Sequence, residues 1–121
     1  MAHNKNEARE QRITDEIVVD AYDAEERALG WYYYLEEQLQ FPFHARCIAA
    51  HPVSPLRRDE EIEVKKMPPE EVCKSDMFVV IEWENRTFAV PLSQLEPIDV
   101  DEETMQGIED WRYWKKQGYE F

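Results

Sequence analysis

The chain has 121 residues, and its 27 acidic side chains outnumber its 14 lysines and arginines, which gives a formal net charge of −13. This length suits one domain, and 43% hydrophobic with 12% aromatic residues exclude a disordered acidic chain. Because a strongly negative protein repels phosphate backbones and anionic lipids, we expect no nucleic-acid or membrane partner. The partners that such a protein attracts are metal cations and basic protein surfaces.

Membrane-spanning, secreted and zinc-binding proteins are also disfavoured. The sequence has no run of about 18 apolar residues that could span a membrane, and residues 1–11 lack the apolar segment of a secretory signal. Cys47 and Cys73 lie too far apart for a compact zinc site, so we expect two free, buried thiols. These features together predict a cytoplasmic protein.

The amino-terminal residues carry little pattern. Residues 1–14 show no periodicity, which predicts a flexible, solvated arm, and residues 15–121 are expected to form a single domain. A short apolar patch at Ile13 and Ile17 is compatible with a strand or with a packing segment.

A helix is predicted over residues 23–40. Asp23 and Glu26 have the spacing of a capping box, in which each side chain satisfies a backbone N–H at the start of the helix. Pro42 ends the helix, because the residue before a proline is displaced from the helical region. Apolar residues recur between these limits at spacings of three and four, namely Ala28, Trp31, Tyr32, Leu35 and Leu39.

After this helix the periodicity changes to two, which is typical of strands. A connector is expected at residues 93–97, and a second helix follows it, with Met105, Ile108, Trp111 and Trp114 on one face. The expected fold is α+β: a small SH3-like antiparallel β-barrel of four to five strands, flanked by an N-terminal and a C-terminal helix. The predicted strands are residues 43–49, 61–65, 77–83 and 87–90.

Catalysis is not expected, because the chain has only three glycines and three histidines and contains neither a G-x-S-x-G elbow nor a phosphate-binding glycine loop. The acidic clusters are more informative. Glu36 and Glu37 lie at the C-terminal end of the first helix, where negative charge opposes the helix dipole. Carboxylates and exposed carbonyls, including one near Gln40, are ligands that Ca²⁺ prefers. A solvated acidic face is an equally simple interpretation.

A second candidate metal site lies before the last helix, at Asp99 and Asp101. These residues occupy positions one and three of a calcium-loop pattern, but Thr104 stands where the loop needs glycine. An EF-hand is therefore disfavoured, and acidic residues that stabilise the start of a helix explain most of this cluster. A cation site that uses Asp99 or Asp101 stays open.

Several segments also resemble the small acidic calcium-binding protein family of cyanobacteria, the CcbP-like proteins. The resemblance extends over roughly residues 11–121 and implies a cytoplasmic, non-EF-hand Ca²⁺ binder with surface carboxylates as ligands. It also favours Glu36 and Glu37 as the best site. The segments that carry it are residues 15–22, 31–36, 41–43, 89–95 and 108–111.

Two functions remain after these steps. The first is reversible Ca²⁺ binding, for buffering or sensing in calcium homeostasis, by a monomer or a weak homodimer. The second is an acidic interaction module that docks a basic protein without a specific ion. Binding that a chelator abolishes would favour the first, and association that is sensitive to salt but not to chelator would favour the second.

Overall fold

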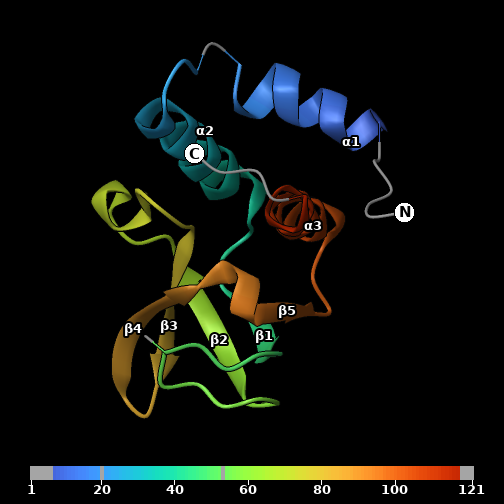
Figure 1. Ribbon diagram of the computed structural model, residues 1–121. Helices are drawn as coiled ribbons and strands as arrows, with labels where there is room; N and C mark the ends of the chain where they lie inside the picture. Colours follow the sequence, from blue (N-terminus) through green and yellow to red (C-terminus); the bar gives the residue numbers. More distant parts are fainter. Residues whose placement is uncertain (1–6, 20, 53, 118–121) are drawn as a thin grey trace.

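The computed structural model describes residues 7–19, 21–52 and 54–117. Figure 1 shows two layers, with the long helices on one side and the strands on the other. The elements in chain order are α1 (Glu7–Arg12), η1 (Ile13–Ile17), α2 (Ala24–Gln38), β1 (Phe43–Cys47), β2 (Glu61–Lys66), η2 (Glu70–Cys73), β3 (Phe78–Trp83), β4 (Arg86–Pro91), η3 (Leu92–Gln94), β5 (Leu95–Ile98) and α3 (Glu102–Lys116).

The strands form one antiparallel sheet in the order β4-β3-β2-β1-β5. The α+β class is confirmed, whereas the SH3-like β-barrel is not confirmed, since the described strands do not form a closed sheet. Three residues of η3, which span at most about 10 Å, bring the edge strands β4 and β5 near each other. In the described part of the chain no ladder joins these two strands, so the sheet is open.

The sheet buries one face against the helices. Alternate residues of β1 are buried and exposed, and β2 shows the same period, which confirms these two predicted strands. β5 occupies most of the segment that was expected to be a connector, and it pairs with β1 from Leu95 to Ile98. Cys47 and Cys73 are free and buried, as expected.

Both long helices begin at an aspartate cap. The Oδ1 atom of Asp23 accepts a hydrogen bond from the Glu26 amide at 2.9 Å, and Asp101 caps α3 in the same way through the Thr104 amide. The helices pack through an aromatic cluster, in which the Trp31 ring lies 5.0 Å from Trp111. The predicted helix over residues 23–40 is confirmed by α2.

The amino-terminal segment differs from the expected solvated arm. Residues 1–6 lie outside the described residues, whereas α1 and η1 are helical from Glu7 to Ile17. Ile13 and Ile17 are almost completely buried in the core. They hold this segment against the rest of the domain, so the apolar patch is a packing segment and not a strand.

Gly30 is required where η1 crosses α2, since a Cβ atom at this position would lie 2.2 Å from the Ile17 carbonyl oxygen. We expect Gly30→Ala to lower the free energy of unfolding by about 1–2 kcal/mol, because backbone must move to relieve the overlap. Urea unfolding measures the effect. Gly107→Ala is the matched control, since its Cβ would meet only the side chains of Gln38 and Leu39 at 3.0–3.3 Å. An equal loss in both variants would contradict this explanation.

Candidate functional site

The C-terminal end of α2 meets the N-terminal end of α3. The Gln40 amide donates a hydrogen bond to Thr104 Oγ1 at 2.9 Å. The side-chain Nε2 of Gln40 lies 3.5 Å from the Glu37 carbonyl oxygen and 3.4 Å from Glu103 Oε2. The carbonyl end of one helix, which carries partial negative charge, is therefore joined to the acidic first turn of the other.

A pocket of about 450 Å³ opens beside this junction, and we call it the helix-end pocket. Its described lining contains three carboxylates and neither lysine nor arginine, so its formal charge is strongly negative. The sequence separates the contributing segments widely, and the pairing of β1 with β5 brings them together. The lining residues are Gln40, Pro42, Phe43, His44, Glu61, Ile98, Asp99, Val100, Asp101 and Thr104.

The two aspartates are held by local backbone structure. Asp101 Oδ1 accepts the Thr104 amide at 2.9 Å, and hydrogen bonding from Thr104 lowers the pKa of the Asp101 carboxyl. Its carboxylate is therefore ionised at neutral pH. Asp99 has a φ of 50°, in the left-handed region that aspartate tolerates better than most residues. Both carboxylates are exposed to solvent.

Glu36 and Glu37 do not line the helix-end pocket. Burial and, next, the charge of Glu36 raise the pKa of Tyr32. Glu36 also contributes to the raised pKa of Tyr33, whose main cause is a hydrogen bond to Glu70. Glu36 lies about one helical turn after both tyrosines, on the same side of α2. Glu37 is exposed, and it contributes to the junction through its main-chain carbonyl.

Three of the five predicted ligands thus line the helix-end pocket, namely Gln40, Asp99 and Asp101. Glu61 and His44 also line it but were not predicted as ligands, because the register of β1 and β2 that places them there depends on tertiary pairing. Within the described residues, no three histidine, cysteine or acidic side chains are already grouped as a metal cluster. Binding of an ion here would therefore require the side chains to move together.

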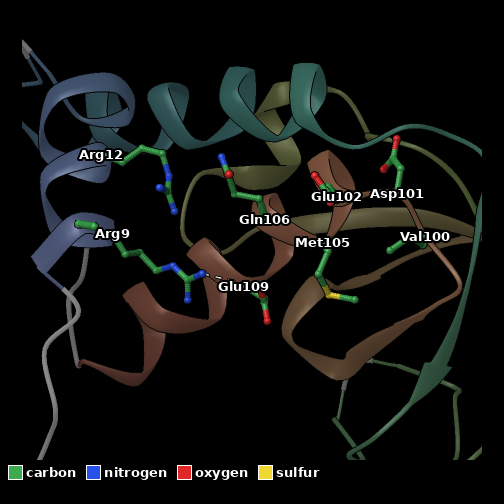
Figure 2. Close-up of a pocket in the computed structure, with 9 residues that line it drawn as sticks. Arg9, Arg12, Val100, Asp101, Glu102, Met105, Gln106 and Glu109 are labelled. Carbon is green, nitrogen blue, oxygen red and sulfur yellow. Dashed lines mark ion pairs between the residues drawn. The ribbon is translucent and has the colours of Figure 1, made fainter.

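A second hollow of about 580 Å³ lies between α1 and α3 (Figure 2). Asp101 and Val100 line both hollows. Arg9 and Arg12 line the second one, and Arg9 pairs with Glu109 at 3.7 Å. Because guanidinium groups contribute to this lining, the second hollow suits a cation less well than the helix-end pocket does.

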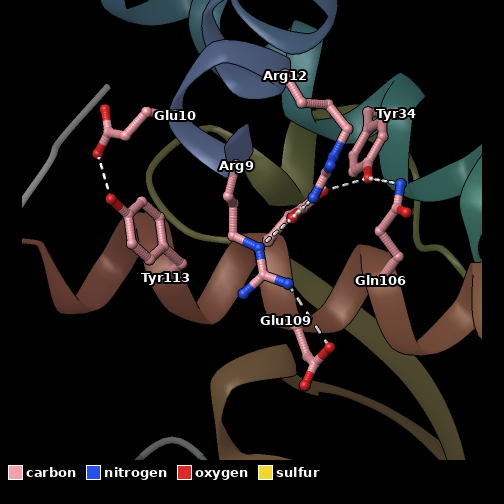
Figure 3. Close-up of polar contacts among 8 residues, drawn as sticks. Arg9, Glu10, Arg12, Tyr34, Gln106, Glu109 and Tyr113 are labelled. Atoms are coloured by element: carbon pink, nitrogen blue, oxygen red, sulfur yellow. Dashed lines mark hydrogen bonds and ion pairs between the residues drawn. The ribbon is translucent and has the colours of Figure 1, made fainter. Parts of the chain in front are cut away.

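Asp110 joins α1 to the long helices. Figure 3 shows its partners, Arg9 and Arg12 on α1 and Tyr34 on α2. The Asp110 side chain is completely buried and lies 2.8 Å from Arg9 Nε and 2.7 Å from Arg12 Nη2. Tyr34 OH donates a hydrogen bond to Asp110 Oδ2, and burial, followed by this bond, raises the pKa of Tyr34 to about 12. Both carboxylate oxygens are occupied, so Asp110 acts as a structural anion.

Sequence reasoning missed this role of Asp110. Asp110 lies three residues after Gly107 and four residues before Trp114, and both of these residues are buried. The spacing places it on the buried face of α3. A charged residue at such a position needs a partner of opposite charge or a hydrogen-bond donor. An aspartate on the buried face of the predicted helix was therefore the signal that could have revealed this role.

Comparisons with known proteins agree on one family. A family of calcium-binding proteins, CcbP, matches residues 11–115. The crystal structure of Anabaena CcbP superposes with a TM-score of 0.88 and is 40% identical, over 99% of this chain and 98% of that chain. A structure described as a calcium-binding protein in the calcium-binding form gives a TM-score of 0.86 at 40% identity, over 97% and 96%.

No curated protein sequence matches the chain. None of the helices in the part of the chain that the structure describes has the length and apolar character needed to cross a membrane. The family match extends over most of the chain, and the structural matches extend over nearly all of it. The chain therefore belongs to the CcbP family of calcium-binding proteins, and its ion is Ca²⁺.

Proposed function

We propose that this protein binds Ca²⁺ reversibly in the helix-end pocket, through Asp99, Asp101 and the side chain of Gln40. The observation that carries the proposal is the charge of the pocket, whose described lining has three carboxylates and no lysine or arginine. The C-terminal end of α2 adds partial negative charge at the same place, which the partial positive charge at the N-terminal end of α3 offsets in part. A bound Ca²⁺ would offset this repulsion and draw the oxygen ligands together.

The chemistry of the donors fits a hard cation. Ca²⁺ takes six to eight oxygen ligands from carboxylates, amides, carbonyls and water. Asp99, Asp101 and Glu61 supply carboxylates, while Gln40 supplies an amide oxygen. The Gln40 Nε2 donates toward Glu37 and Glu103, which leaves the amide oxygen available as an acceptor. Water would complete the ligand set.

The arrangement suits a buffer or sensor more than a permanent structural site. The carboxylates are exposed and are not grouped within the described residues. Ion binding must therefore offset the conformational entropy that these side chains lose when they are ordered. This favours an affinity near ~10⁻⁷–10⁻⁵ M, in the range of calcium sensors. Adaptable oxygen ligands also favour Ca²⁺ over Mg²⁺, which demands a regular octahedron. We propose a non-EF-hand, cytoplasmic and non-catalytic role in calcium homeostasis.

Isothermal titration with Ca²⁺ at physiological ionic strength, with Mg²⁺ in excess as competitor, tests the proposal. We expect Ca²⁺ binding in the micromolar range that excess Mg²⁺ weakens only slightly, because the larger ion accepts an irregular oxygen set. The control is a titration with Mg²⁺ alone of protein from which a chelator has removed bound metal. Absence of binding, or equal affinity for both ions, would contradict a selective calcium function.

A further inference from the structure

A separate hollow of about 160 Å³ lies between α2 and η2, and we call it the α2–η2 hollow. Among the described residues, it shares none with the helix-end pocket. Its size is that of one aliphatic side chain and not of a cofactor. Its lining residues are Glu25, Ala28, Leu29, Glu70, Glu71, Cys73 and Lys74.

Within the described residues, the surroundings of the hollow include apolar side chains that are exposed to solvent. Ala28 and Cys73 are buried, and Leu29 is half-buried beside them. Next to the hollow on the same two elements, Tyr33 is 50% exposed and Val72 is 41% exposed. They are two of the five large hydrophobic residues that are exposed in the described part of the chain. Grouped apolar exposure of this kind marks an interaction surface.

Carboxylates surround these apolar groups. Glu25, Glu70 and Glu71 line the hollow, whereas Lys74 is the one basic residue in its lining. Glu36, which lies three residues after Tyr33 on α2, adds negative charge on the same side of the helix. A small hollow with Ala28, Leu29 and Cys73 in its lining and several carboxylates beside them matches an aliphatic side chain that is flanked by lysine or arginine.

The surface is fixed before any partner arrives. Tyr32 OH donates a hydrogen bond to the Pro68 carbonyl oxygen at 2.5 Å, and Tyr33 OH donates to Glu70 Oε2 at the same distance. The two tyrosine rings also contact each other edge to face, with centroids 5.4 Å apart. The two hydrogen bonds tie η2 and the segment just before it to α2. A preformed surface loses less conformational entropy on binding.

We propose that the α2–η2 hollow docks a basic amphipathic segment of another protein, which inserts one aliphatic side chain and places lysine or arginine against Glu25 and Glu71. The charge complementarity selects this partner among the possible occupants of the surface. Since the hollow shares no described residue with the helix-end pocket, docking does not require Ca²⁺.

Fluorescence anisotropy with a labelled amphipathic helical peptide of leucine and lysine tests this proposal, in the presence of EDTA. We expect Glu25→Gln/Glu71→Gln to weaken binding by roughly tenfold, because two complementary charges are lost. The control, Glu82→Gln/Glu84→Gln, removes the same charge at the β3–β4 hairpin. It should change the dissociation constant by less than about twofold, because salt screens the effect of distant surface charges. Glu70 is left intact because it holds Tyr33.

A second peptide, with its leucines replaced by alanine, tests the apolar hollow without altering the protein. It should bind at least roughly tenfold more weakly, since alanine buries far less apolar surface. No binding of the leucine peptide, equal weakening by both double variants, or equal affinity for both peptides would each overturn the proposal. Because EDTA is present throughout, failure here leaves the calcium proposal untouched.

Discussion

Asp110→Asn is expected to lower the free energy of unfolding by about 3 kcal/mol or more. This is the usual effect of removing one partner of a buried ion pair, because the other charge is left without compensation. The carboxylate is completely buried and is shared by Arg9 and Arg12 on α1 and by Tyr34 on α2. An asparagine of the same shape presents an NH₂ group to donors that need an acceptor. Urea denaturation followed by circular dichroism measures the change.

The neighbouring residue gives a matched control. Glu109 also pairs with Arg9, but at 3.7 Å and with a side chain that is 50% exposed. An exposed pair of this kind contributes about 0–1 kcal/mol, so Glu109→Gln should be nearly neutral. Hydrogen exchange should also show earlier opening of α1 in Asp110→Asn only. Similar losses of stability in both variants would show that burial of Asp110 is not the cause.

Asp99→Asn/Asp101→Asn is expected to weaken Ca²⁺ binding by roughly 100-fold, because two charged ligands at ion-contact distance are replaced by neutral amides. The fold should survive. Asparagine is as good an N-cap as aspartate, so α3 keeps its first hydrogen bond, and asparagine also tolerates the positive φ at position 99. Titration calorimetry with a thermal melt on each variant separates loss of affinity from loss of structure.

Glu36→Gln/Glu37→Gln is the control for this experiment, since it removes the same charge at the end of α2. Neither residue lines the helix-end pocket, so only the screened long-range field changes and affinity should fall by less than about threefold. The opposite pattern, with a large loss in this variant and little in the aspartate pair, would assign the site to Glu36 and Glu37.

The elements that could be predicted from sequence are those whose burial pattern is local. α2 repeats its apolar residues at helical spacing between a capping aspartate and a proline. β1 and β2 alternate buried and exposed residues over five or six positions. α1 has no buried residue of its own. Its helix depends on ion pairs to Asp110, which lies 98 residues from Arg12, and no local pattern reveals such a contact.

β5 and the open sheet were missed for related reasons. β5 has four residues and includes Pro97, so its alternation is too short to distinguish from a connector. Whether consecutive short strands close into a barrel depends on which edges pair. Here β4 and β5 share no ladder in the described residues and are connected through η3, and a three-residue 3₁₀ turn has no clear sequence signature.

The helix-end pocket shows how far residue chemistry alone can locate a site. Asp99, Asp101 and Gln40 were selected as ligands for Ca²⁺ because of their oxygen atoms, but as parts of two separate sites. Their convergence depends on the contact of Gln40 with Thr104, 64 residues apart. Glu36 was grouped with Gln40 because both are near the end of α2, yet it lies on the side that faces η2.

The aromatic packing of the helices has a spectroscopic consequence. Three of the four tryptophans lie at the contact of α2 with α3, where the ring of Trp31 is 5.0 Å from Trp111 and 5.6 Å from Trp114. Trp83 is separate, on β3 beside Phe88. Intrinsic fluorescence and exciton-coupled circular dichroism therefore report mainly on the helical layer. In a Trp83→Phe variant the tryptophan signal would come from the helical layer alone. Separation of the helices could then be followed without a label.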